Sequence, residues 1–179
     1  MISGKSGHGK DTVAQMMKEI LEKDNKRVLV IHFADLVKHY ARDYYNWNGQ
    51  KDEAGRALLQ KIGTTMMRKY YPTYWAEIVG KFLAVAGYWN EFNYCLIPDW
   101  RFKNEFSTVY LHNSKINKIY TIRVNRKNYR NPAMTDEQFN HISETELDDI
   151  NFDWIIDNNG NLLDLKAYVN MALSYIDIH

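Results

Sequence analysis

The residues with the clearest chemistry form a glycine-rich run near the start of the sequence, residues 4–12 (GKSGHGKDT). The run has the spacing G-x-x-x-x-G-K, with Gly4, Gly9 and Lys10 at the fixed positions. Glycines let such a loop curl until its backbone N–H groups face an anion, and the lysine adds a mobile charge for the β- and γ-phosphates of a nucleotide. The spacing therefore predicts a nucleotide-phosphate site. The simpler alternative is a glycine-rich turn that caps a helix.

A helix is expected directly after this loop. Apolar residues recur there at helical spacing, namely Val13, Met16, Met17, Ile20 and Leu21. The loop thus leads into a helix N-terminus, where the dipole and the free N–H groups favour phosphate. We expect ATP contacts from Gly4, Gly7, His8, Gly9, Lys10, Asp11 and Thr12. The His8 backbone N–H should lie near phosphate, while its side chain should face solvent.

The residues after Lys10 bear on the metal. Asp11 stands where a serine or threonine usually follows the lysine, and the hydroxyl comes one place later, at Thr12. Lysine, any residue and then threonine is the arrangement of small nucleotide kinases such as adenylate kinase. We therefore assign the hydroxyl on the Mg²⁺ side to Thr12. Asp11 should act either as a carboxylate at the helix N-terminus or as a contact of the metal shell.

A second candidate site follows an apolar run at residues 96–102 (LIPDWRF). An apolar strand that ends in Asp99 places a carboxylate at the carboxyl edge of a parallel sheet, where such sheets bind ligands. There Asp99 could hold Mg²⁺ or accept a proton, and Arg101 could hold a phosphate. The alternatives are a turn or helix-cap role for Asp99 and a surface pairing of Arg101 with Glu105.

A charged segment, about residues 125–150, is expected to form a lid. Phosphoryl transfer needs cations against the moving charge and exclusion of water, and an arginine-bearing loop that closes would provide both. Arg126 and Arg130 are the best candidates. The alternative is a solvated basic loop. The acidic residues between Asp136 and Asp149 are expected mostly to form a solvated face.

An acceptor-binding insert is expected at about residues 35–90, before the Asp99 strand. Charge there comes from Asp35, Lys38, Arg42, Arg56 and Arg68, and flat surfaces for a base come from Tyr44, Trp47, Tyr74 and Trp75. For any one aromatic residue, core packing is the competing interpretation. Trp75 lies on the apolar face of its expected helix, which favours the core for that residue.

The order of elements predicts an α/β fold. Apolar runs indicate strands at residues 27–33, 93–97, 119–124 and 152–156, and helical periodicity indicates helices at 35–44, 52–70, 74–87, 104–112 and from about 162. Strands alternating with helices imply a parallel sheet with helices on both faces. Only three residues precede Gly4, which leaves open either a very short first strand or a sequence that lacks a few initial residues.

Composition limits the classes of partner. The 179 residues fit a single domain spanning 1–179, with the insert and the lid as parts of it. A net charge of +1 gives no general attraction to nucleic acid or to a membrane, and the single cysteine, Cys95, suits a reducing cytoplasm. The abundant aromatic residues (13 Tyr, 5 Trp and 7 Phe) make a homodimer plausible.

The sequence resembles the bacteriophage-type deoxynucleoside monophosphate kinases, a branch of the P-loop nucleoside monophosphate kinases. The resemblance rests on stretches spread over most of the chain: residues 4–12 (GKSGHGKDT), 33–38 (FADLVK), 59–68 with Trp75 (LQKIGTTMMR), 98–105 (PDWRFKNE), 141–144 (HISE) and 156–160 (IDNNG). Their order and spacing together carry the match.

The resemblance implies a P-loop kinase fold and transfer of the γ-phosphoryl of ATP, with Mg²⁺, to a deoxynucleoside 5′-monophosphate. By position, the ATP and Mg²⁺ cradle would consist of Gly7, Gly9, Lys10 and Thr12, and the acceptor would be bound by Asp35, Lys38, Arg68 and Trp75. The transferred phosphoryl would lie near Asp99 and Arg101, and Asp99 would share the metal with Thr12. The lid would contain Arg126 and Arg130, and the adenine would lie near Asn159.

Other functions stay open. A dephospho-coenzyme A kinase shares the Asp-Asn-Asn-Gly turn before the final helix, here residues 157–160. A non-catalytic nucleotide-binding switch would keep the loop without turnover, although the lid arginines argue against it. A kinase acting on modified bases within DNA is disfavoured by the near-neutral charge.

Overall fold

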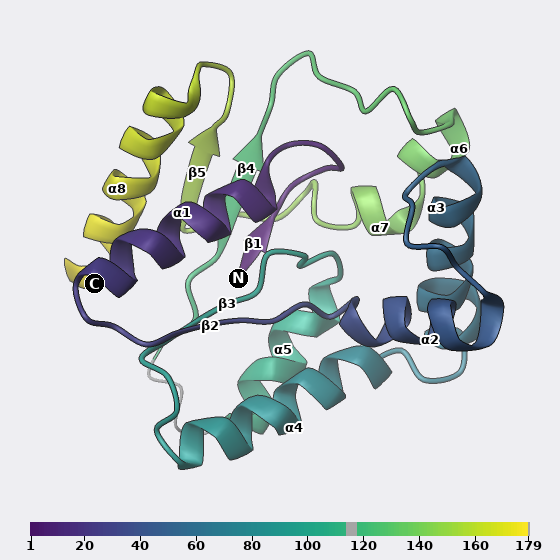
Figure 1. Ribbon diagram of the computed structural model, residues 1–179, viewed down its shortest axis with the longest axis horizontal. Coiled ribbons are helices and arrows are strands. Elements are labelled where there is room, and N and C mark those ends of the chain that lie inside the picture. The colour runs from purple at the N-terminus through teal and green to yellow at the C-terminus, as the bar shows by residue number, and fades with distance from the viewer. Residues whose placement is uncertain (114–117, 179) are drawn as a thin grey trace.

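The protein contains a parallel sheet with the strand order β2-β3-β1-β4-β5, seen in a computed structural model that describes residues 1–113 and 118–178 (Figure 1). One group of strands consists of β1 (Ile2–Ser3), β4 (Ile122–Asn125) and β5 (Trp154–Asp157), and the other of β2 (Val28–Val30) and β3 (Tyr94–Leu96). Backbone hydrogen bonds join the groups: the Ile2 N–H donates to the Ile97 carbonyl (2.8 Å), and the Trp100 N–H to the Ile2 carbonyl (3.2 Å). The pairs β1–β4, β4–β5 and β2–β3 are parallel, as the sequence predicts.

Helices cover both faces of the sheet because its apolar residues alternate in direction. Tyr94 and Leu96 pack with α1 (Lys10–Lys23) and α8 (Leu162–Ile178), while the intervening Cys95 packs with α4 (Tyr74–Tyr88) and α5 (Lys103–His112). Figure 1 shows α1 beside α8 and α4 beside α5. Two apolar cores result, and their helices hold the ends of the strands in place. The α/β arrangement predicted from the sequence is confirmed.

The insert between β2 and β3 has an apolar cluster of its own. It contains α2 (Asp35–Tyr45), α3 (Glu53–Gln60) and the π-helix η1 (Lys61–Met66), which pack around Val37, Ile62 and Trp75. The helix expected over residues 52–70 is present in part: the chain is helical from Glu53 to Met66, and its second half is the wider η1. The Trp75 indole N–H donates to the Gly63 carbonyl at 3.0 Å. Gly63 lies in η1, so this side-chain contact is made where the backbone hydrogen bonds change from the α-helical to the π-helical pattern.

The segment between β4 and β5 contains two short helices, α6 (Asp136–Phe139) and α7 (Ile142–Thr145). Side chains cap both: the Thr135 hydroxyl accepts the Gln138 N–H (3.2 Å), and the His141 ring accepts the Ser143 N–H (3.2 Å). Neither helix is long enough to give the sequence an apolar period, which is why only an irregular segment was expected. None of the helices in the described part of the chain has the length and apolar character needed to cross a membrane.

Candidate functional site

The glycine-rich residues 4–9 form a loop between β1 and α1, which we call the phosphate loop. Gly9 has φ +97°, and a Cβ there would lie 2.5 Å from Nδ2 of Asn158. Gly7 has φ +82°, and its Cβ would lie 2.5 Å from the Tyr129 ring. Both positions therefore need glycine for backbone conformation and for space. The loop is enclosed by segments from the far end of the sequence.

Lys10 lies at the first turn of α1 with its side chain almost fully buried. Its Nζ donates to the Lys5 carbonyl at 3.0 Å. The pKa of Lys10 is lowered to about 7, mainly by desolvation and also by the charge of nearby Arg101, while the carboxylates of Glu144, Asp11 and Asp99 partly oppose the decrease. A phosphate group beside Nζ would favour the charged form that burial disfavours.

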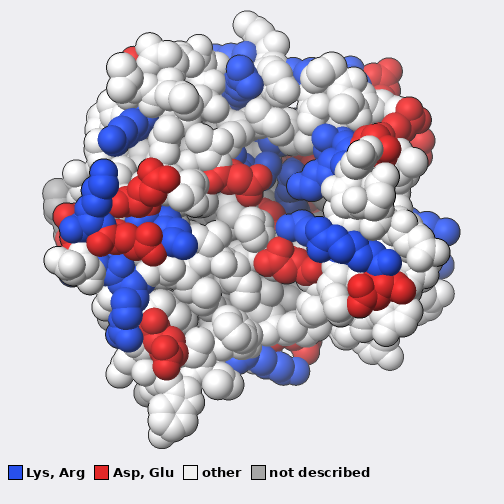
Figure 2. Space-filling model, viewed as in Figure 1, with Lys and Arg blue, Asp and Glu red and all other residues white. Residues whose placement is uncertain are grey.

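Two cavities flank the phosphate loop. The first cavity, about 570 Å³, has a mixed lining, visible as a hollow near the centre of the face in Figure 2, with basic and acidic side chains around it. Its cations are Lys10, Lys38, Lys51, Arg56, Arg68 and Arg101, its carboxylates are Asp11, Asp99, Glu105 and Glu144, and its apolar walls include Phe33, Val37, Leu59, Trp75 and Met134. Charge and flat apolar surface are thus combined in one space.

The second cavity, about 710 Å³, opens on the other side of the loop. It is lined by Gly7, Gly9, Thr12, Arg126, Asn158, Gly160, Asn161, Leu162, Leu163 and Leu165. Gly7 borders both cavities. Thr12 faces this second cavity, whereas Lys10 and Asp11 line the first, because successive residues of α1 point in different directions.

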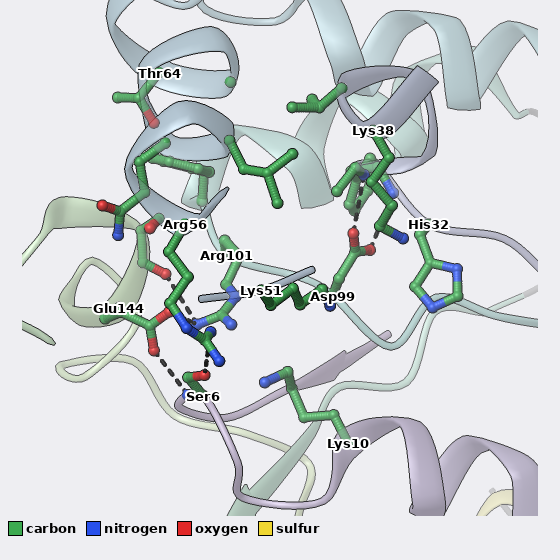
Figure 3. Close-up of a pocket in the computed structure, with 18 of the residues that line it drawn as sticks. Ser6, Lys10, His32, Lys38, Lys51, Arg56, Thr64, Asp99, Arg101 and Glu144 are labelled. Carbon is green, nitrogen blue, oxygen red and sulfur yellow. Dashed lines mark hydrogen bonds and ion pairs between the residues drawn. The ribbon is translucent and has the colours of Figure 1, made fainter. Parts of the chain in front are cut away.

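Asp99 lines the first cavity and also anchors the backbone. Its carboxylate accepts the N–H groups of Phe33 (3.0 Å) and Ala34 (2.9 Å), at the start of α2 (Figure 3). The turn role considered for Asp99 is therefore present together with its position at the sheet edge. In the same region Asp11 contacts His32 (3.3 Å), and this hydrogen bond lowers the pKa of Asp11 and raises that of His32.

Arg101 lies beside Lys10 and pairs with a carboxylate from the segment between β4 and β5. Its Nη1 contacts the Glu144 carboxylate at 2.8 Å and donates to the Ser143 carbonyl at 3.2 Å. The surface pairing with Glu105 considered for the Arg101 side chain is wrong: Glu105 accepts the Arg101 backbone N–H and forms its ion pair with Arg68.

The acceptor-site candidates divide into two groups. Lys38, Arg68 and Trp75 line the first cavity, and Asp35 does not. Arg68 is already paired with Glu105, and its guanidinium carbon lies 3.9 Å from the centre of the Phe102 ring. Trp75 is 2% exposed, so it belongs to the core of the insert as well as to the cavity wall.

The buried Glu105 carboxyl explains why Arg68 is held in this way. The pKa of Glu105 is raised to about 7, mainly by desolvation, although the Arg68 charge and the N–H groups of Arg101 and Phe102 oppose the rise. A buried carboxylate needs such partners to stay charged. Arg68 therefore has a structural contact that the sequence pattern did not indicate.

The lid candidates are also separated. Arg126 lines the second cavity and lies over the Tyr129 ring, with its guanidinium carbon 4.3 Å from the ring centre. Arg130 pairs with Asp136 at the surface and lines neither cavity. The expected lid arginines thus do not share one space in this conformation.

The residues near the expected adenine site differ in position. Asn158 donates to the His8 carbonyl at 3.0 Å and lines the second cavity, whereas Asn159 accepts the Lys127 N–H and does not line it. The expectation that the His8 side chain faces solvent is wrong. The ring is 8% exposed, and its Nδ1 accepts the Arg126 N–H at 3.2 Å. It fills the space between the loop and the end of β4, and desolvation lowers its pKa.

The first cavity is also lined by residues that the sequence analysis did not select as binding residues. Ser6 and Lys51 line it, and Arg56, named only as a charge of the insert, donates from Nη1 to the Ser6 hydroxyl at 3.2 Å. Glu144, expected on a solvated face, is buried. The only available signal for Glu144 was its place in the short HISE stretch, since its segment has no period that predicts burial.

Comparison with known proteins supports the fold. No protein-family model matches the chain, and no curated protein matches it. A structure of the Mycobacterium tuberculosis APS kinase CysC in complex with AMPPNP and APS is similar, with 12% identity and a TM-score of 0.50 over 98% of this chain and 95% of that chain. A cysteine-to-alanine mutant of the same enzyme gives 13% identity and a TM-score of 0.49 over 98% and 94%. The P-loop kinase fold is confirmed; the phage-type family stays a prediction.

Proposed function

We propose that this protein is an ATP-dependent kinase that transfers the γ-phosphoryl of ATP to a deoxynucleoside 5′-monophosphate. The observation that carries the proposal is the pair of cavities that meet at Gly7, one on each side of the phosphate loop. A kinase must bind donor and acceptor on opposite sides of the phosphoryl that moves. The loop with Lys10 lies between these two spaces.

The second cavity suits the nucleoside part of ATP. Leu162 and Leu163, at the start of α8, are 67% and 79% exposed beside it, which offers apolar surface to a base. Arg126 and Asn158 supply donors at its edge. The phosphates would then pass over the phosphate loop toward Lys10.

The first cavity suits a phosphorylated aromatic molecule. Phe33, Val37 and Trp75 provide walls for a base. Within the described residues, Lys51 and Arg56 have no acidic partner, and Nε of Arg56 is buried without a hydrogen bond. Such cations fit an acceptor phosphate better than Arg68, whose charge is already paired with Glu105.

The residues of the first cavity also fit Mg²⁺. Asp11 and Asp99 line this cavity with Lys10, and Mg²⁺ takes one or two carboxylates together with phosphate and water oxygens. The structure contains no group of three or more metal-ligating side chains among its described residues, which suits an ion held largely by nucleotide. Asp11 and Asp99 would hold the ion, Thr12 facing the other cavity; when bound, Mg²⁺ neutralises charge on the phosphate oxygens.

A phosphate acceptor is favoured over a hydroxyl acceptor by the surroundings of Asp99. Both of its oxygens already accept backbone N–H groups and fix the start of α2, so the carboxylate is not placed to receive a proton from an attacking hydroxyl alone. A phosphate is already largely ionised near neutral pH and needs no base. Positioning and charge neutralisation by Lys10 and Arg101 then provide most of the catalysis.

The test is an acceptor panel. The purified protein with ATP and Mg²⁺ is offered each deoxynucleoside monophosphate, dephospho-coenzyme A and APS, and ADP and phosphorylated products are separated by chromatography. We expect a diphosphate product from at least one monophosphate, and Lys10→Ala should abolish it. Product from a hydroxyl acceptor alone would overturn the acceptor class, and tight ATP binding without acceptor-stimulated ADP release would indicate a nucleotide-binding switch.

A further inference from the structure

Glu144, in α7, connects the phosphate loop to Arg101. Its side chain is 6% exposed. One carboxylate oxygen accepts the backbone N–H of Ser6 at 2.8 Å, and the other contacts Nη1 of Arg101 at 2.8 Å (Figure 3). Two groups from distant parts of the chain are thus fixed by one buried carboxylate.

Arg101 is held from one side only. Its Nη1 has two acceptors from α7, the Glu144 carboxylate and the Ser143 carbonyl. Within the described part of the chain, its Nε and Nη2 have no protein partner and remain available to a ligand in the first cavity. An arginine fixed at one nitrogen loses less side-chain entropy when it binds a phosphoryl group, because part of that cost is already met in the folded protein.

Ser6 is held on its other side as well. Its hydroxyl accepts hydrogen bonds from Arg56 (3.2 Å) and Asn131 (3.0 Å). The loop amide bound by Glu144 therefore belongs to a residue whose side chain is also fixed. Loss of the carboxylate would release the Ser6 N–H and Arg101 without removing these two contacts.

Charge balance favours the same arrangement. Arg101 and Lys10 lie close enough for Arg101 to lower the pKa of Lys10, while Glu144 raises it. A buried carboxylate between the loop and Arg101 thus allows two cations to face one cavity.

We propose that Glu144 is a positioning residue for phosphoryl transfer: it fixes the phosphate loop at Ser6 and aligns Arg101 through Nη1, leaving the other nitrogens of Arg101 for the phosphoryl that moves. This inference rests on the kinase function proposed above. Glu144 acts through Ser6 and Arg101 and does not itself contact the substrate.

The decisive variant is Glu144→Gln. Its amide has one acceptor oxygen, whereas Ser6 N–H and Arg101 Nη1 are both donors, so one of the two contacts is lost. We expect kcat to fall about 30-fold or more, with KM for ATP and for the acceptor changed by less than about threefold. Glu144→Asp keeps the charge and should recover part of kcat. Glu146→Gln is the matched control. Glu146 lies two residues after Glu144, lines neither cavity, and accepts the Lys103 N–H.

A double-mutant cycle separates positioning from general damage. If Glu144 acts through Arg101, Glu144→Gln in an Arg101→Ala background should lower kcat by less than about threefold further. Effects that multiply independently, or an unchanged kcat in Glu144→Gln, would overturn the proposal. Thermal unfolding of each variant identifies those that no longer fold.

An NMR measurement tests the same idea without turnover. In the wild type, the Arg101 guanidinium signals should show slow rotation of the group. In Glu144→Gln, this rotation should become faster and the chemical shift of the Ser6 amide should change. If the Arg101 guanidinium group rotated equally fast in the wild type and in Glu144→Gln, the positioning role would be overturned, even if the protein turned over no acceptor. Absence of turnover with restricted Arg101 would instead overturn only the kinase function.

Discussion

The carboxylate of Asp99 accepts the backbone N–H of Ala34 at 2.9 Å, so a residue three positions after the end of β3 fixes the start of α2. It accepts the Phe33 N–H at 3.0 Å in the same way. The wall of the first cavity and the edge of the sheet are therefore held together by one side chain. Any loss of activity on changing Asp99 must be separated from loss of this anchor.

Asp99→Asn should lower both stability and turnover. The amide keeps one acceptor oxygen and loses the charge, so we expect the free energy of unfolding to fall by about 1–2 kcal/mol and kcat by about 100-fold or more. Urea unfolding and steady-state kinetics measure the two effects. Asp153→Asn is the matched control, since Asp153 accepts the Thr121 N–H and hydroxyl away from both cavities and should affect stability alone. A kcat near that of the wild type would rule out a role for Asp99 in the reaction.

Arg56→Ala should weaken acceptor binding selectively. Its guanidinium lines the first cavity without an acidic partner among the described residues, and we expect KM for the monophosphate to rise about 10- to 100-fold. KM for ATP should rise much less, because the only contact of Arg56 with the phosphate loop that the structure shows among its described residues is the hydrogen bond to the Ser6 hydroxyl. Initial rates with each substrate varied in turn give both constants. Arg42→Ala is the control, because Arg42 lies in the same insert over the Trp47 ring and lines neither cavity. Equal effects of the two variants would contradict the assignment.

Gly9→Ala should damage the phosphate loop. The new Cβ would lie 2.5 Å from Asn158 on a backbone with positive φ, so we expect the free energy of unfolding to fall by about 1–3 kcal/mol. ATP affinity, measured by calorimetric titration, should fall with it.

Gly87→Ala makes the same chemical change as Gly9→Ala but should raise the stability of the protein instead of lowering it. A Cβ at Gly87, in α4, meets nothing within 4 Å, so the variant should be stabilised by about 0.5–1 kcal/mol with ATP affinity unchanged. If Gly9→Ala behaved like Gly87→Ala, the geometry of the loop would be incorrect.

Glu105 should make stability depend on pH. Burial raises its pKa to about 7 in the folded protein, above the unfolded value of about 4.3, so the folded state binds this proton more tightly. The stabilisation from this proton is complete below about pH 4 and is lost as pH rises through about 7. Urea unfolding at several pH values should show the decline in the wild type, and Glu105→Gln should flatten it. Parallel curves for the two proteins would contradict the assignment.

Much of the fold follows from local patterns. Alternating strands and helices predict the parallel sheet, and the carboxyl ends of parallel strands must meet, which brings Lys10, Asp99 and Arg101 to one cavity. The helix expected over residues 52–70 is shorter in the structure and becomes a π-helix at Lys61, a change of helix type that apolar periodicity does not predict.

The remaining site residues depend on packing that no local pattern encodes. Glu144 is buried because the short helix α7 lies against the phosphate loop and Arg101. Arg68, in the turn after η1, pairs with Glu105 of α5, which is distant in sequence. The division of Asp11 and Thr12 between two cavities requires knowing where each cavity lies relative to α1. These features need the three-dimensional structure.

The central position of β1 in the sheet limits when this strand can fold during synthesis. This two-residue strand is the middle strand of the sheet, and its backbone partners, Ile97 and Ile122, are synthesised much later. Residues Ile2 and Ser3 can therefore reach their final positions only after the strands on both sides of them have been made. A chain released before residue 122 would carry the glycine run without the strand that pairs with β1, so nucleotide binding should begin only after β4 has been made.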